Sequence, residues 1–153
     1  MNISELLNPA AIAADLKAKE KNGVLSELTD SILQAAGNLD REEIIRVLQE
    51  RERLGSTGIG DGVAIPHGKL KNIDRLLISF GRSEEGIDFN SMDGRPAHLF
   101  FLLIAPEESV GVHLKTLARI SKLLKNPNVR QRLMATSDPA GLYQIIVEEE
   151  GKL

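Results

Sequence analysis

Apolar residues in the first third of the chain recur at helical intervals. Between Asn22 and Ala36 they are spaced by three and four positions, which predicts an amphipathic helix that ends at Gly37-Asn38. Asp40 followed by Glu43 resembles an N-terminal capping box, so a second helix is expected from Asp40 to about Arg53. Both helices would turn one apolar face toward a core.

A glycine-dense segment, Gly55 to Gly62, interrupts this helical pattern, and short apolar runs follow it. The runs predict strands at Val63–Ile65, Leu76–Gly81 and Ala97–Ala105. The third run is apolar at nearly every position, which is typical of a strand buried on both faces of a sheet.

Helical spacing returns in the last third of the chain. Helices are expected from about Ser109 to Lys125, from Val129 to Ala135 and from Pro139 to Glu149. Strands interleaved with helices indicate an α/β sandwich. Since no repeat, low-complexity stretch or flexible linker divides the 153 residues, residues 1-153 are expected to form a single domain.

Composition narrows the classes of function. The chain has no cysteine, which excludes disulfides, thiolate nucleophiles and cysteine-based metal sites. Only 3% of the residues are aromatic and the net charge is −3, so no nucleic-acid partner is indicated. The N-terminus lacks the features of a signal peptide, and the apolar run Leu99 to Ala105 is too short to span a bilayer. We therefore expect a cytoplasmic protein without membrane insertion.

The strongest chemical signal is His67, which ends the segment Gly58-Ile59-Gly60-Asp61-Gly62-Val63-Ala64-Ile65-Pro66-His67 and precedes Gly68. Pro66 stops the strand and Gly68 lets the backbone turn away, which would leave the imidazole at a sheet edge beside free backbone amides. Such amides form anion-binding concavities. The segment is neither a P-loop nor a dinucleotide fingerprint, because it lacks Gly-Lys-Ser/Thr and its glycines precede a strand. A surface-turn histidine without a role is the alternative.

Two further side chains have the chemistry to assist a charged group on His67. His113 lies near the start of its helix, where free N–H groups disfavour an imidazolium, so a neutral His113 could donate to a phosphoryl oxygen. The alternative is a histidine at the edge of the core. Arg51 continues the apolar stripe of its helix, so its guanidinium needs a phosphoryl group or a structural carboxylate, unless it reaches solvent.

The remaining candidates are weaker. His98 opens the central strand without a companion signal and is interpreted as structural. The three histidines lack ligand spacing such as i, i+4, so no metal site is expected, and no serine lies in a nucleophile-elbow sequence. The stripe Lys115, Arg119, Lys122 is interpreted as a solvated helix face that could also contact an acidic partner.

Taken together, these residues resemble the type 2 IIA domain of the bacterial phosphoenolpyruvate:sugar phosphotransferase system (PTS EIIA type-2), and within it the nitrogen-regulatory branch. The similarity is carried by the segments Arg51–Gly60, Val63–Leu70, Phe100–Pro106, His113–Leu117 and Leu142–Ile146, and it spans nearly the whole chain. The resemblance implies a mixed, about five-stranded β-sheet sandwiched by α-helices on both faces.

By this resemblance, His67 would accept a phosphoryl group from an HPr-like phosphocarrier, with His113 as an auxiliary residue and Arg51 stabilising the phosphate. The loop that contains Ser56, Thr57, Gly58 and Gly60 would help to offset the added charge through its amides. No metal or organic cofactor is implied. Docking of two proteins around the histidine would require an apolar rim, to which Ile59 is expected to contribute.

Three other functions stay open. A sugar-specific IIA component of the fructose or mannitol branch would pass its phosphate to a IIB domain, whereas the Gly-Ser-Thr-Gly-Ile-Gly loop favours the regulatory branch and its nitrogen- and potassium-linked target proteins. A pure binding module would never be phosphorylated. A metal-dependent hydrolase would contain bound metal.

Overall fold

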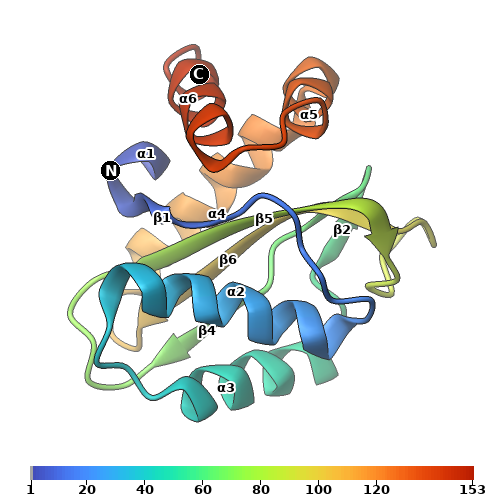
Figure 1. Ribbon diagram of the computed structural model, residues 1–153. Coiled ribbons are helices and arrows are strands. Elements are labelled where there is room, and N and C mark those ends of the chain that lie inside the picture. The colour runs from blue at the N-terminus through green and yellow to red at the C-terminus, as the bar shows by residue number, and fades with distance from the viewer. Residues whose placement is uncertain (1) are drawn as a thin grey trace.

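The computed structural model describes residues 2–153, and within them the chain forms one mixed β-sheet between two layers of helices (Figure 1). The expected α/β architecture is confirmed, although the sheet has six strands instead of about five. The strands are β1 (Leu7–Ala13), β2 (Gly58–Gly60), β3 (Val63–Ala64), β4 (His67–Leu70), β5 (Leu77–Ile87) and β6 (Ala97–Pro106). The helices are α1 (Ile3–Leu6), α2 (Lys21–Ala36), α3 (Arg41–Arg53), α4 (Val110–Lys125), α5 (Pro127–Met134) and α6 (Pro139–Glu150).

Strand β6 is the centre of the sheet, whose order is β1-β5-β6-β3-β2 with β4 also paired to β6. Its side chains alternate between two cores. Phe101 and Leu103 pack in the core that includes α4, α5 and α6, and Phe100 and Leu102 pack in the core that includes α2 and α3. The prediction that this strand is buried on both faces is therefore confirmed.

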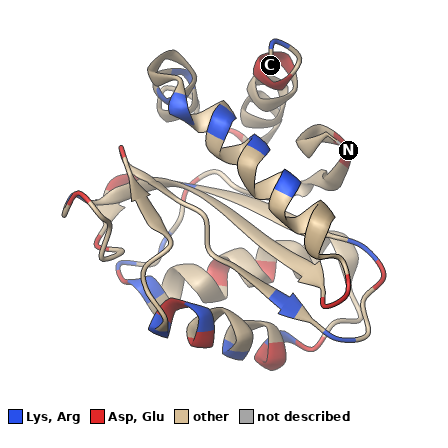
Figure 2. Ribbon diagram, turned by 180° about the vertical axis from the view of Figure 1, so that it is seen from behind, with Lys and Arg blue, Asp and Glu red and all other residues tan. Residues whose placement is uncertain are grey.

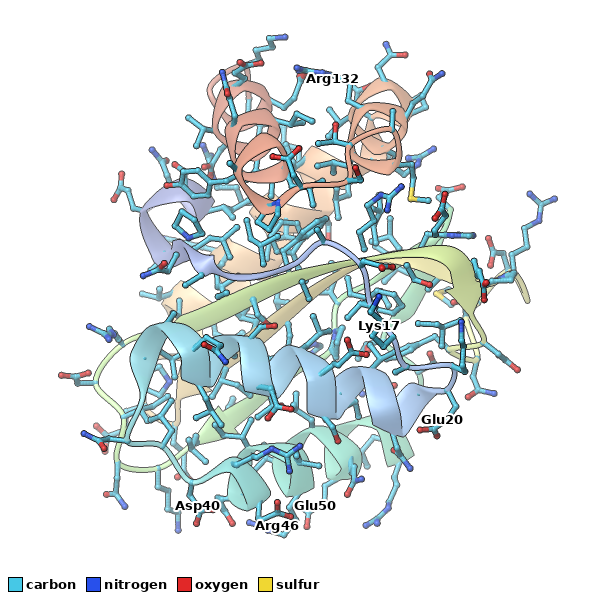
Figure 3. All side chains as sticks on the ribbon, viewed as in Figure 1. Lys17, Glu20, Asp40, Arg46, Glu50 and Arg132 are labelled. Carbon is cyan, nitrogen blue, oxygen red and sulfur yellow. The ribbon has the colours of Figure 1, made fainter. Side chains whose placement is uncertain are left out.

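The predicted helices agree with the structure to within a residue or two, and their ends have the expected causes. Gly37 follows α2 with a φ of 60°, a conformation that favours glycine. Asp40 accepts a hydrogen bond from the amide of Glu43 at 3.2 Å at the start of α3. The Glu43 carboxylate pairs with Arg46 instead of reaching back, so the capping box is one-sided. Asp40 and Arg46 are both labelled in Figure 3. No helix within residues 2–153 has the length and apolar character needed to cross a bilayer.

Several elements were not predicted from the pattern of the sequence. The first twenty residues include α1 and β1, and β1 pairs in parallel with β5 with a register shift between Leu7 and Ile12. Strand β5 continues past the predicted end at Gly81 to Ile87, through a polar stretch that an apolar periodicity does not reveal. These differences leave the predicted bounds of the central strand β6 unchanged to within one residue.

Pro66 separates two strands that follow one another along β6. Strand β3 pairs in parallel with β6 at Leu99 and Phe100, and β4 pairs in parallel with the same strand from Leu103 onward. Pro66 has no N–H for the ladder, but its carbonyl accepts a hydrogen bond from the amide of Leu103 at 3.0 Å. The prediction that a strand stops before Pro66 is correct, whereas His67 opens a new strand instead of lying in a turn.

Candidate functional site

An open groove of about 630 Å³ lies where β4 meets the last turns of α3 and the first turns of α4. Among the described residues β4 pairs with β6 alone, so side chains from both helical layers meet beside its free edge. His67, His113 and Arg51 all line this groove. The structure therefore brings together three candidates that come from separate segments of the chain.

The His67 imidazole is half-buried, and its Nδ1 lies 2.8 Å from the carbonyl oxygen of Ile65. A carbonyl can only accept a hydrogen bond, so this contact assigns the proton to Nδ1 and leaves the lone pair on Nε2. Burial of the ring lowers the pKa of His67 below its ordinary value; the charge of Arg51 lowers this pKa further, and the Ile65 carbonyl and Glu52 raise it in part. At neutral pH the ring is neutral and Nε2 is nucleophilic.

Gly68 is required for space. A Cβ atom at this position would lie 2.5 Å from Cγ1 of Val47 on α3, so β4 packs directly against that helix. The expectation that Gly68 serves to turn the backbone is wrong, because the residue lies inside β4. The close approach of β4 to α3 is what places His67 near the end of α3 that carries Arg51.

His113 lies in the first turn of α4, as expected, and is almost completely buried. Its ring centroid is 5.4 Å from that of His67, and the two rings are nearly perpendicular at 78°. Burial, followed by the proximity of His67 and Lys69, lowers the pKa of His113 to about 4, so it is neutral at pH 7. Its Nε2 is buried and has no hydrogen-bond partner among residues 2–153. A buried polar atom without a partner is rare in folded proteins, which marks this position as one whose hydrogen bonding the free chain leaves unsatisfied.

Arg51 lies in the last turn of α3 and is half-buried, which agrees with its place on the apolar stripe. Its Nη1 donates to the carbonyl oxygen of Gly55 at 3.0 Å. Within the described chain it forms no ion pair with a carboxylate at 4.0 Å or less. The guanidinium therefore has hydrogen-bonding capacity left for an anion in the groove.

The side-chain hydroxyls of the loop that precedes β3 are already bonded within the protein. Ser56 donates its hydroxyl to the carbonyl of Phe89 and accepts from the amide of Gly58 at 3.0 Å. Thr57 donates both its hydroxyl and its amide to the Glu52 carboxylate. Gly58 and Gly60 pair with β3, and none of Ser56, Thr57, Gly58 and Gly60 lines the groove. The role of these four residues as phosphate ligands stays a prediction.

Exposed apolar side chains surround the groove. Leu54 is 84% exposed, Leu114 is 61% exposed and Val110 is 46% exposed, and all three line it. Ile59, which was expected to contribute to such a rim, is 45% exposed on β2 but is not part of the groove lining. We call Leu54, Val110 and Leu114 the apolar rim.

The other sequence candidates lie apart from this groove. His98 lies at the start of β6, and its Nδ1 is 2.9 Å from the carbonyl oxygen of Ser83 on β5. Within residues 2–153 no group of three or more histidine or acidic side chains is arranged to hold a metal ion. Figure 2 shows basic residues along α4, and Arg119 in this stripe is bound to the buried carboxylate of Glu150 at 2.6 Å, whereas Lys115 and Lys122 are exposed.

Glu52 is the residue near the site that the sequence analysis missed. Its side chain is only 6% exposed, and it bonds to Lys21 and Thr57. A signal was available, because Glu52 follows Ile45 and Leu48 at i+7 and i+4, on the buried stripe of α3.

The groove thus combines a neutral histidine with a free Nε2, a second neutral histidine and an arginine that has no carboxylate partner among residues 2–153, beside an apolar rim. This combination suits an anionic group. Comparison with known proteins agrees. The family model "Phosphoenolpyruvate-dependent sugar phosphotransferase system, EIIA 2" matches residues 5–149, and the chain belongs to this family. Its members are phosphotransfer components of that system.

Some of the similar proteins are named nitrogen regulatory proteins and others are named sugar-specific components. The nitrogen regulatory protein of Bradyrhizobium diazoefficiens is 42% identical over 146 residues, which cover 95% of each chain. The fructose-specific EIIABC component of Bacillus subtilis is 38% identical over 151 residues, which cover 98% of this chain and 24% of that longer protein. The crystal structure of nitrogen regulatory protein IIA-Ntr from Neisseria meningitidis matches with a TM-score of 0.87 and 32% identity, over 94% of this chain and 98% of that one.

Proposed function

We propose that this chain accepts a phosphoryl group on Nε2 of His67 from an HPr-like phosphocarrier and acts mainly in nitrogen- or potassium-linked regulation in the cytoplasm. The observation that carries the proposal is the contact between His67 Nδ1 and the Ile65 carbonyl, because it leaves the lone pair of Nε2 free in a groove shared with His113 and Arg51. Family membership and the names of two relatives that match this chain over almost their whole length support the regulatory assignment.

The chemistry is an in-line displacement at phosphorus. The Nε2 lone pair forms a new N–P bond while the N–P bond to the carrier's histidine breaks, and that leaving nitrogen keeps the bonding electron pair. No proton has to leave Nε2, since the proton of the ring is on Nδ1. The positive charge that develops on the ring is stabilised by the Ile65 carbonyl, which already accepts the Nδ1 hydrogen bond.

Arg51 and His113 would stabilise the transferred group. The phosphorylated side chain would carry roughly −1.5 to −2 charges, by analogy with other phosphorylated residues. The Arg51 guanidinium lines the same groove and has donors left for this charge, and neutral His113 has a ring nitrogen, without a partner among residues 2–153, that would donate to a phosphoryl oxygen. Ser56 and Thr57 would have to release their present partners to contribute side-chain bonds.

A second candidate is a sugar-specific IIA component that passes its phosphate to a IIB domain. The observation that favours it is the 38% identity to a fructose-specific EIIABC component over almost the whole chain. The two candidates share the chemistry at His67 and differ in the protein that receives the phosphate or senses it. Transfer from the phosphorylated chain to a purified fructose IIB domain within seconds would favour this second candidate.

The phosphotransfer assay tests the acceptor. Incubation with enzyme I, an HPr-like carrier and phosphoenolpyruvate should add one acid-labile phosphoryl group, and His67→Ala should abolish it. His113→Ala should still be labelled but should form a less stable product or transfer onward more slowly. His98→Ala is the control, because His98 lies outside the groove. Labelling of His67→Ala at the normal rate would overturn the proposal.

A further inference from the structure

Glu52 is a buried carboxylate that the mechanism above does not use. It lies in the last turn of α3 with a side chain that is 6% exposed, and it accepts a hydrogen bond from Lys21 Nζ at 3.0 Å. Both remaining contacts go to one residue, since the hydroxyl of Thr57 and its amide, at 3.3 Å, donate to the same carboxylate. Burying a carboxylate is costly unless hydrogen bonds compensate for the lost hydration, and Glu52 accepts three of them. This compensation indicates that the buried acid has a specific structural or functional role.

From Thr57 the hydrogen bonds continue to His67. The carbonyl oxygen of Thr57 accepts from the amide of Ile65 at 3.0 Å, and the carbonyl oxygen of Ile65 accepts from Nδ1 of His67 at 2.8 Å. The path therefore runs from the Glu52 carboxylate through the Thr57 backbone and the Ile65 peptide to the imidazole. Because the N–H and the C=O of Ile65 belong to different peptide groups, the path acts by holding the Ile65 backbone in place and not by relaying polarisation.

Ile65 depends on this path for its orientation. It lies between β3, which ends at Ala64, and β4, which begins at His67, so neither strand ladder holds its peptide group. Its amide is bonded instead to Thr57, whose own position is fixed by Glu52. Lys21 completes the support, because its ammonium also lies 4.6 Å from the centre of the Phe89 ring.

We propose that Glu52 and Thr57 are positioning residues that fix the ring orientation and the Nδ1–H tautomer of His67 through the peptide of Ile65. The inference rests on the proposed function for its effect on phosphotransfer, but its effect on the free imidazole is independent of that function. A second ring orientation would break the Nδ1 contact and turn Nε2 from the approaching phosphorus.

Thr57→Val is the deciding variant. It removes the hydroxyl and keeps the shape of the side chain, the Thr57 backbone and the pair between Lys21 and Glu52. Glu52→Gln removes the charge, and Thr57→Ser restores a hydroxyl. The matched control is Glu42→Gln, which neutralises an 82% exposed glutamate on the same helix. Circular dichroism and thermal unfolding establish that each variant is folded.

Two readouts separate positioning from a structural role. Nitrogen-15 NMR chemical shifts of the His67 ring in the free protein report its tautomer. Single-turnover transfer from the phosphorylated carrier gives the maximal rate and the carrier concentration at which the rate is half-maximal. We expect Thr57→Val and Glu52→Gln to show a mixture of tautomers and a maximal rate reduced about tenfold, with the half-maximal concentration within about twofold of wild type. Thr57→Ser and Glu42→Gln should resemble wild type.

An unchanged His67 tautomer and an unchanged maximal rate in folded Thr57→Val would overturn the inference. So would a loss that appears only in the half-maximal carrier concentration, because that result would assign Thr57 to docking. If wild-type protein is never phosphorylated, the proposed function fails, and the ring shifts still decide whether Glu52 and Thr57 set the tautomer.

Discussion

The rings of His67 and His113 stand 5.4 Å apart and nearly perpendicular, with both imidazoles neutral at pH 7. One ring has a defined tautomer through Ile65, and the other has a buried nitrogen without a partner. The pair therefore presents a nucleophilic nitrogen and an unused polar atom in the same groove, without the repulsion that two imidazolium ions would create.

The low pKa of His113 predicts a pH-dependent stability. The pKa of His113 is about 4 in the folded protein and 6.5 in the unfolded chain, so on acidification the unfolded state binds the proton first. This contribution is fully present above pH 6.5 and is lost as the pH falls toward 4. Between pH 7 and pH 5 we expect its loss to reduce the free energy of unfolding by roughly 2 kcal/mol.

Urea denaturation at the two pH values measures this effect. His113→Gln should remove most of the difference between pH 7 and pH 5, whatever its stability at pH 7. His98→Gln is the control and should retain the wild-type difference. An identical pH dependence in wild type and His113→Gln would contradict the assignment.

Arg51→Gln should change the pH dependence of phosphotransfer as well as its rate. The guanidinium lowers the pKa of His67, so its removal should raise that pKa and make the rate fall at a higher pH on acidification. Loss of a charged donor to the phosphoryl group should also slow transfer at pH 7.5 about tenfold or more. Labelling rates from pH 5 to pH 8 measure both effects. Arg53→Gln, an exposed neighbour outside the groove, should leave both near wild type.

The apolar rim should contribute to docking and little to stability. Leu54→Ala removes a side chain that is 84% exposed, so we expect no appreciable change in thermal unfolding and an increase of about threefold to tenfold in the carrier concentration for half-maximal rate. Met92→Ala is a close match at 83% exposure outside the groove and should change neither quantity. Equal effects of the two substitutions would show that Leu54 has no special place in docking.

Gly68→Ala should destabilise the fold by steric overlap. The new methyl group would lie 2.5 Å from Cγ1 of Val47, which predicts a loss of about 1–3 kcal/mol in the free energy of unfolding. Val47→Ala removes the overlapping methyl group, so the double variant Val47→Ala/Gly68→Ala should lose less than the sum of the single losses. Additive losses in urea denaturation would disprove the overlap.

Much of the fold, and the three candidate side chains that meet in the groove, were accessible from the sequence for simple reasons. The apolar stripes of α3 and α4 fixed which helix faces turn inward, and Arg51 and His113 lie on those faces. The irregular start of β1 and the polar second half of β5 were not accessible, because their pairing depends on neighbours that a local pattern does not contain.

The hydrogen-bond partners of the residues near the groove could not be predicted from the sequence. Glycine-rich composition indicated a loop with free amides, and it did not indicate that the hydroxyls of Ser56 and Thr57 and the amide of Thr57 donate to Phe89 and Glu52. Local sequence does not reveal that Phe89, far along the chain, supplies an acceptor. Glu52 was hidden for a different reason, since a charged residue at the end of a helix is usually solvated.

Pro66 separates the part of the chain that anchors the His67 backbone from the part that orients its ring. The backbone of His67 pairs opposite Leu103 on β6. The orientation of its ring is set by the hydrogen bond from Nδ1 to the carbonyl oxygen of Ile65, which precedes the proline. Because β4 pairs with β6 independently of the β2–β3 hairpin, we expect changes in the length or sequence of that hairpin to leave the His67 Cα atom in place. Changes in that hairpin would therefore tune how readily the imidazole reacts while its location stays constant.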